Sequence, residues 1–188
     1  MSLRLISALM LSGALLGGCA AQHNGYAEFA SETVDRAPYL LATGDRLRVI
    51  VFGQDNLSNI YAVDSQGRIS MPLIGAVDVV GRTAGQLERS IEGRLRGGFL
   101  REPKVSVEID AYRPFFILGE VTSSGQFPYV NGMTVQTAVA IAGGFTPRGD
   151  RHVAVISRQI NGEIVTGKVS LTQPVLPGDT ITIRERWF

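Results

Sequence analysis

Few side chains in this chain combine the types and spacing that catalysis needs. A glycoside hydrolase requires two carboxyl groups roughly 5–10 Å apart across a cleft, one of them with a raised pKa. Glu108 and Asp110 come nearest, because positions i and i+2 of a strand share one face. The run Val105–Asp110 alternates apolar and polar residues, however, and such alternation by itself predicts acids on a solvated face. We therefore interpret both as surface residues and predict a protein that is not an enzyme.

Two further acids, Glu102 and Glu120, complete the candidate carboxylates. Glu120 lies between Gly119 and Val121, so its side chain is open to three interpretations. It could contact a ligand, contact a neighbouring subunit, or make a structural hydrogen bond, and the sequence does not separate these roles.

The sequence has few of the residues that bind cofactors or metal ions. The chain of 188 residues has two His and a single Cys, which excludes a disulfide framework and a cysteine-rich metal site. We expect no cofactor and no metal. The formal net charge of +1 provides no basic excess to neutralise phosphates, so nucleic acid is not an expected partner.

Arginines gather at two places in the sequence. They could contact an anionic polysaccharide, pair with a neighbouring subunit's carboxylate, or stabilise a helix C-terminus. Because these roles use the same residue type, no polymer-binding residue is assigned. The arginines are Arg94, Arg96, Arg101, Arg148 and Arg151.

The N-terminus is typical of a secretory targeting segment. After Arg4, the apolar run Leu5–Leu16 makes about 18 Å of helix, well short of the ~30 Å hydrocarbon core of a bilayer. The run ends in Leu16-Gly17-Gly18-Cys19, which looks like a bacterial lipobox. The alternative is an ordinary signal peptide followed by a chance cysteine. We predict a lipoprotein signal peptide at 1–18 and acylation, palmitate included, of Cys19.

The residues after Cys19 predict where the protein resides. Ala20, rather than Asp, follows the cysteine, and by resemblance to lipoprotein sorting rules this favours the outer membrane. Several acyl chains make the anchor stable, since one alone binds only marginally. Residues 21–37 are polar and mixed, without a clear period, so we expect residues 19–37 to form a lipidated tether.

Short strands with frequent turns dominate from Pro38 onward. Leu47–Phe52 is rich in β-branched residues, and Asp64-Ser65-Gln66-Gly67 predicts a hairpin loop between strands at Ile60–Val63 and Arg68–Ser70. Pro72-Leu73-Ile74-Gly75 then breaks the chain before a strand at 77–80.

One helix interrupts these strands. Thr83 and Gln86 form a capping box, and Leu87, Ile91 and Leu95 fall on one face. Gly97-Gly98 predicts its C-terminal end.

A second block begins near residue 113. We expect strands at Phe115–Val121 and Phe127–Val130, with a turn at Ser123–Gly125. A compact helix follows at Thr134–Ala142, stopped by Gly143-Gly144. Asn161-Gly162 predicts a hairpin between Val153–Arg158 and Ile164–Val169. The order β-β-α-β-β resembles a β-grasp unit.

One turn occurs twice. Thr43-Gly44-Asp45 precedes an alternating run, and Pro177-Gly178-Asp179 does the same near the C-terminus. We expect both aspartates to accept hydrogen bonds from backbone N–H groups within their turns rather than to act as catalysts.

These elements together resemble the outer-membrane polysaccharide export proteins, the Wza-like family. In the first block the similar motifs are Tyr39–Asp45, Val51-Phe52-Gly53, Val63-Asp64 with Gly67, Pro72–Gly75, Gly81-Arg82-Thr83 and Pro103–Val107. In the second they are Gly119-Glu120-Val121, Gly125 and Ala142–Phe145. No single motif is specific to the family, because most of them are turn residues. Their occurrence in the same order along the chain is specific.

The resemblance implies an α+β fold with two domains. A β-rich polysaccharide export domain with one packed helix spans 38–112, and an SLBB (soluble-ligand-binding β-grasp) domain spans 113–188. The C-terminal strand either completes the second domain or returns to the first. The motif turn residues are given structural or subunit-contact roles: Gly44, Asp45, Gly67, Pro72, Gly75, Gly119, Glu120, Gly125, Gly143 and Gly144.

The resemblance also implies a function. We expect an outer-membrane lipoprotein, anchored on the periplasmic face, whose homo-oligomeric ring forms the periplasmic part of a capsular or exopolysaccharide export channel. Its expected partners are the polysaccharide, an inner-membrane co-polymerase that feeds the ring, and a separate outer-membrane β-barrel. We expect the short form of the family, because no segment after Cys19 approaches the ~20 apolar residues of a spanning helix.

Two other classes of function remain open at this point. The first is a monomeric periplasmic lipoprotein that binds an oligosaccharide or a cell-wall fragment. The second, more distant, is a glycan hydrolase that uses the four carboxylates named above.

Overall fold

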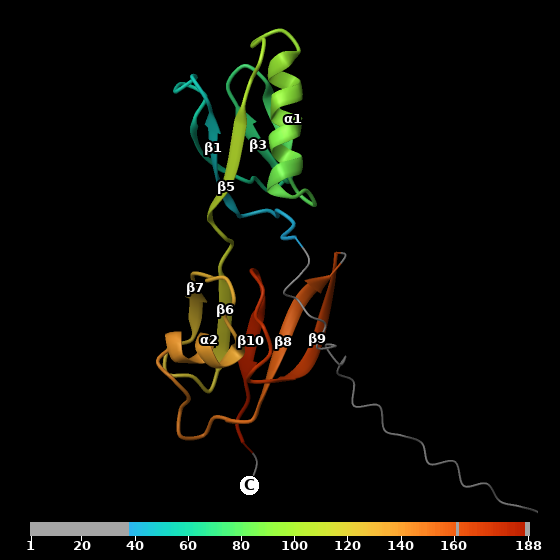
Figure 1. Ribbon diagram of the computed structural model, residues 1–188. Helices are drawn as coiled ribbons and strands as arrows, with labels where there is room; N and C mark the ends of the chain where they lie inside the picture. The colour runs from blue at the N-terminus through green and yellow to red at the C-terminus, as the bar shows by residue number, and fades with distance from the viewer. Residues whose placement is uncertain (1–37, 161, 187–188) are drawn as a thin grey trace, which may run out of the picture.

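A computed structural model describes residues 38–160 and 162–186 of the chain. Figure 1 shows two domains, one above the other, joined by the short segment that follows residue 111. Each domain has its own hydrophobic core, and the two cores share no residue. The mixed α+β class expected from the sequence is confirmed.

The first domain is built on a three-stranded sheet in which β1 (Arg46–Val51) lies between β2 (Asn59–Ala62) and β5 (Val105–Ala111). Both neighbours run antiparallel to β1. A separate hairpin pairs β3 (Arg68–Met71) with β4 (Gly75–Asp78). Alternate β1 side chains are buried, as the β-branched run predicts.

The predicted hairpin between β2 and β3 is wrong. The turn itself forms, since the Gly67 N–H donates to the Asp64 carbonyl at 2.9 Å and the Asp64 N–H donates to the Arg68 carbonyl at 2.8 Å. The strands on either side then diverge into different sheets. Because β3 pairs with β4 instead, the segment Pro72–Ile74 is a hairpin loop and not only a break.

Helix α1 (Ala84–Arg96) confirms the predicted amphipathic helix. Its capping box is present in full, and its buried side chains are the predicted Leu87, Ile91 and Leu95. They pack into the first core beside the sheet.

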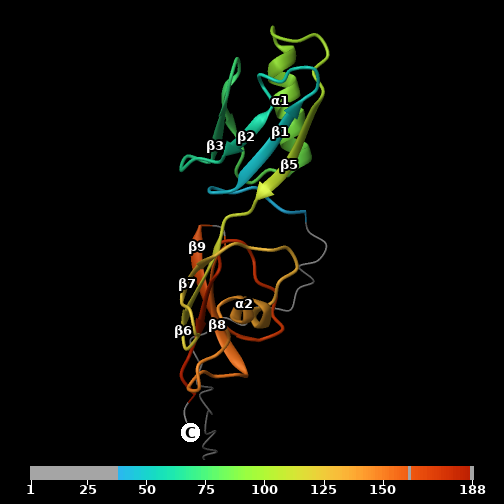
Figure 2. The ribbon, with the colours of Figure 1, turned by 90° about the vertical axis from the view of Figure 1, so that its left-hand side faces the viewer.

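The second domain contains a five-stranded sheet in the order β7-β6-β10-β8-β9. Figure 2 shows α2 beside this sheet, on one side of it. The C-terminal strand β10 lies at the centre, parallel to β6 and antiparallel to β8, so it completes the second domain. The element bounds are β6 (Phe115–Gly119), β7 (Gly125–Phe127), α2 (Val135–Ile141), β8 (Val153–Ile160), β9 (Glu163–Ser170) and β10 (Thr180–Ile183).

In this domain the predicted hairpin is confirmed, whereas one predicted strand lies at a different place in the sequence. The hairpin around Asn161-Gly162 forms and is longer than expected, with Ile160 paired to Glu163 at its end. The short strand predicted at Phe127–Val130 instead lies at Gly125–Phe127, because Gly125 pairs with Ile117 and starts the ladder two residues earlier. In the described part of the chain, no helix is both long and apolar enough to span a membrane.

Candidate functional site at the junction of the two domains

The two repeated Gly-Asp turns adopt the same structure. Gly44 and Gly178 have φ angles of +91° and +86°. Each following aspartate is buried and accepts from the N–H three residues before it: Asp45 from Ala42 at 2.8 Å, and Asp179 from Leu176 at 2.7 Å. The predicted role of these carboxylates within the turns is confirmed.

Arg113 lies between the two turns and contacts both. Its backbone N–H donates to Asp45 Oδ1 at 2.9 Å, and its Nε donates to the Pro177 carbonyl at 2.9 Å. A Cβ added at Gly178 would lie 2.6 Å from Arg113 Nε, so only glycine leaves room for this side chain. One residue thus joins the turn that opens β1 to the turn that opens β10.

Three tyrosines line the same junction. The Tyr39 hydroxyl donates to the Asp45 carboxylate, 2.9 Å from Oδ2 and 3.1 Å from Oδ1. Tyr112 stands edge-to-face against Tyr39 and against Tyr129, with ring centroids 4.9 and 5.3 Å away. Burial, and then the charge of Asp45, raises the pKa of the Tyr39 hydroxyl well above its usual range. This hydroxyl therefore stays a donor at physiological pH.

The second turn is held by a charge pair. Arg158 binds Asp179 through two bonds, Nε to Oδ1 at 2.9 Å and Nη2 to Oδ2 at 2.7 Å. The Arg158 side chain is 11% exposed and that of Asp179 is 1% exposed, so the pair is shielded from water. A bidentate arrangement of this kind fixes geometry as well as charge.

Neither buried aspartate is available as a base or a nucleophile. Tyr39, Ala42 and Arg113 donate to Asp45, while Arg158 and Leu176 donate to Asp179. A carboxylate is an acceptor only, and these donors occupy both of its oxygens. The junction is equipped to hold two domains in register, and its side chains do not form a catalytic arrangement.

The carboxylates considered for hydrolysis are arranged as structural residues. Asp110 sits at a bulge in the β1–β5 ladder and accepts from Arg48 Nη2 at 2.7 Å, with Arg46 at 3.6 Å. Glu120 accepts from the Thr146 hydroxyl. Glu102 and Glu108 are exposed and belong to the first domain, whereas Glu120 lies in the second.

The motif residues of the second domain come together at the end of β6. The Thr122 N–H donates to the Gly144 carbonyl at 2.9 Å and its hydroxyl to the Gly143 carbonyl at 2.9 Å. Gly119 packs against the backbone of Ile183. In the first domain, Asp45 and Gly44 lie at the junction, whereas Pro72 lies in the β3–β4 loop and Gly75 is the first residue of β4. Every motif glycine has a positive φ: Gly44, Gly67, Gly75, Gly119, Gly125, Gly143 and Gly144.

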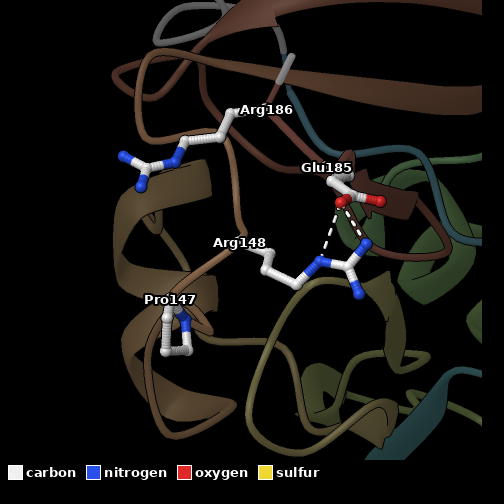
Figure 3. Close-up of a pocket in the computed structure, with 4 residues that line it drawn as sticks. All are labelled: Pro147, Arg148, Glu185 and Arg186. Carbon is white, nitrogen blue, oxygen red and sulfur yellow. Dashed lines mark hydrogen bonds and ion pairs between the residues drawn. The ribbon is translucent and has the colours of Figure 1, made fainter. Parts of the chain in front are cut away.

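A shallow pocket near the end of the described chain is lined by Pro147, Arg148, Glu185 and Arg186 (Figure 3). The Arg148 Nε donates to Glu185 Oε1 at 2.7 Å, and Figure 3 shows this ion pair among the residues that line the pocket. Both side chains are largely exposed, so the pair is a surface contact of small energetic weight. The pocket lacks the paired acids of a hydrolase.

Arg113, Arg158 and Tyr112 were not identified from the sequence. Their partners lie far along the chain, 64 to 68 residues away for Arg113, so no local pattern reveals them. The repeated Gly-Asp turn was the signal that could have identified the junction, because one copy precedes β1 and the other precedes β10.

Cys19, the predicted lipidation site, lies outside the described residues.

Comparisons with known proteins agree with this architecture. Residues 33–110 match a family described as "Polysaccharide biosynthesis/export protein", and residues 114–169 match the SLBB domain. The chain is 31% identical over 144 residues to the exopolysaccharide production protein ExoF of Rhizobium meliloti (strain 1021). It is 25% identical over 175 residues to the polysialic acid transport protein KpsD of Escherichia coli.

The matches cover most of this chain and a minor part of the relatives. They span 76% of the chain for ExoF and 87% for KpsD, but only 32% and 31% of those proteins. The chain therefore belongs to the polysaccharide export proteins, with a polysaccharide biosynthesis/export domain followed by an SLBB domain. This is an export family and not a catalytic one.

Proposed function

We propose that this protein forms the periplasmic ring of a capsular or exopolysaccharide export channel. The observation that carries the proposal is the pair of domain matches in family order, combined with the junction that fixes one domain against the other. A hydrated polymer cannot cross hydrocarbon, so it needs a continuous aqueous passage, and subunits arranged in a closed ring provide one. The names of ExoF and KpsD support a role in exopolysaccharide or capsule export.

The partners follow from the same proposal. An inner-membrane co-polymerase delivers the polymer to the ring, and a separate outer-membrane protein continues the passage. The acylated Cys19 holds the ring at the periplasmic face of the outer membrane.

Deleting the gene and measuring exported polymer tests the proposed role. We expect loss of surface polysaccharide with polymer retained inside the cell or in the periplasm, and restoration by the wild-type gene. Unchanged export, without accumulation, would show instead that the chain is a binding lipoprotein outside the channel.

Oligomeric state separates the ring from a monomeric binding module. Detergent-extracted protein, measured by multi-angle light scattering and viewed by electron microscopy, should form a closed ring of identical subunits. A monomer at all accessible concentrations would contradict the ring.

The anchor is tested separately. Mass spectrometry of the mature protein should find Cys19 at the N-terminus carrying acyl chains. Cys19→Ser should yield an unprocessed or released species, while Ser31→Ala, a change within the predicted tether, should be processed normally. An unmodified Cys19 in the wild type would refute the anchor.

A further inference from the structure

The end of the first domain that lies away from the second domain carries three exposed apolar side chains. Phe52, Leu73 and Phe99 are 63%, 55% and 50% exposed. They follow three different elements: Phe52 comes directly after β1, Leu73 is in the loop between β3 and β4, and Phe99 is just past α1. Single exposed apolar residues are ordinary on protein surfaces, but three on neighbouring loops at one end are not.

The topology places all three at this end. Strand β1 starts at the junction, where Asp45 binds Arg113, and therefore ends at Val51 on the far side. The Phe52 N–H donates to the Lys104 carbonyl at 3.0 Å, which places the start of β5 beside it. Arg94, in the last turn of α1, donates to the carbonyl of Ala76 beside the Leu73 loop. Figures 1 and 2 both show these loops at the end of the domain away from β6–β10.

Leu73 is held outward at a steric cost. The Ile74 N–H donates to the Pro72 carbonyl at 2.9 Å, closing a three-residue turn, and Leu73 is the only non-glycine among the described residues with a positive φ, at +68°. Glycine or asparagine would relax this backbone, whereas leucine is strained there. Folding gains nothing from a strained, exposed leucine, and this favours a functional role for the side chain.

Cations surround these apolar side chains. The three loops and the last turn of α1 hold two carboxylates, Asp55 and Glu102, against four basic residues. The four are Arg94, Arg96, Arg101 and Lys104. All four are exposed, so their charge acts on whatever approaches this end.

We propose that this end of the first domain, the membrane-contact tip formed by Phe52, Leu73, Phe99 and the four cations, inserts into the interface of an anionic lipid bilayer. Apolar side chains on loop tips, flanked by Arg and Lys, match a surface of negatively charged headgroups above hydrocarbon. A second copy of the same tip is disfavoured, because the two cationic surfaces repel. The three exposed side chains stand on loops at the end of the domain, and a projecting apolar surface of this kind fits a lipid interface better than a bound peptide.

Site-specific fluorescence tests the proposal on the full chain. Cys19 is the only cysteine, so in a Cys19→Ser background a polarity-sensitive dye can be placed at one position alone. Asn56→Cys puts the dye in the loop after Phe52, and Asn131→Cys puts it on an exposed turn of the second domain as the matched control. The vesicles contain equal parts phosphatidylglycerol and phosphatidylcholine, with nitroxide-labelled acyl chains for quenching.

We expect the dye at position 56 to shift its emission to the blue and to be quenched, while the dye at 131 stays in water. Arg96→Glu with Lys104→Glu should weaken vesicle partitioning roughly thirtyfold or more, given the usual contribution of one basic residue at an anionic bilayer. Arg89→Glu with Arg151→Glu makes the same change in net charge elsewhere and should have little effect. Vesicles of pure phosphatidylcholine, or high salt, should also abolish insertion.

Leu73→Gly distinguishes function from folding. It removes the strained side chain, so the protein should unfold at the same or a higher temperature and yet insert less. The proposal is overturned if the dye at position 56 stays in water on anionic vesicles, if the dye at 131 responds equally, or if Leu73→Gly inserts like the wild type. A tip that binds an acidic protein instead would give the first of these results.

Discussion

Gly119→Ala is the substitution whose effect the structure defines most sharply. Gly119 ends β6 and pairs with Ile183 at the end of the parallel strand β10. Its φ is +86°, and a Cβ added there would lie 2.1 Å from the Ile183 carbonyl oxygen. That oxygen already accepts a hydrogen bond from the Glu120 N–H at 2.9 Å. Because both clashing atoms are tied to paired backbone, no side-chain rotation relieves the contact.

Two contributions set the magnitude. An L-residue in the left-handed region costs about 1–2 kcal/mol. Forcing a methyl group into a packed region costs about 1–3 kcal/mol more. Together they predict a loss of about 2–5 kcal/mol, a large part of the ~5–15 kcal/mol that stabilises a typical domain.

Gly75→Ala is the matched control. Gly75 has a φ of +68° and no atom within 4 Å of an added Cβ, so it should lose only the first contribution, about 1–2 kcal/mol. Urea unfolding followed by far-UV circular dichroism measures both variants, with the slope against urea checked for constancy. If Gly119→Ala loses no more free energy of unfolding than Gly75→Ala, the backbone contact with Ile183 does not constrain the fold.

Three further effects follow from the polar contacts. Asp179→Ala removes the carboxylate that pairs with the shielded Arg158 guanidinium and should cost about 3–5 kcal/mol in urea unfolding. Asp110→Ala should cost less than about 1 kcal/mol, because its partner Arg48 is half exposed; equal losses for the two would contradict the burial argument. The raised pKa of Tyr39 stabilises the fold fully below its ordinary value of 10.0, and this contribution is lost as the pH rises further. Tyr39→Phe should therefore flatten the loss of stability above about pH 10, measured by urea unfolding at a series of pH values, and an unchanged slope would assign that loss to other groups.

The sequence predicted well where the determinants were local. The capping box of Thr83 and Gln86 and the spacing of the three buried side chains define α1 within a few turns of chain. Asn161-Gly162 likewise predicted the β8–β9 hairpin, since a two-residue loop fixes the register of its strands. The repeated Gly-Asp turn predicted the hydrogen bonds of Asp45 and Asp179.

Non-local pairing explains what was missed. Nothing near Arg68 indicates that β3 leaves β2 for β4, because both pairings satisfy the same alternation. The parallel pairing of β10 with β6 joins residues more than 60 positions apart. The residues of the junction were predicted least well. Arg113 has its role only because the fold brings the two turns to it, and the sequence around Arg113 does not indicate this.

Arg113 offers a final test of how the two domains are held. Its backbone N–H binds Asp45 in the first domain, and its guanidinium binds the Pro177 carbonyl in the second. Arg113→Ala keeps the first contact and removes the second, so both cores should stay folded while the junction loosens. The Gly178 N–H, which donates to the Pro114 carbonyl at 3.0 Å, should then exchange its hydrogen faster, and small-angle scattering should show a broader distribution of dimensions. Arg89→Ala, an exposed arginine of α1, is the control and should change neither. If Arg113→Ala leaves the exchange of Gly178 and the scattering unchanged, the orientation of the domains is fixed by the tyrosine contacts of Tyr112, and the arginine is not the residue that joins the two turns.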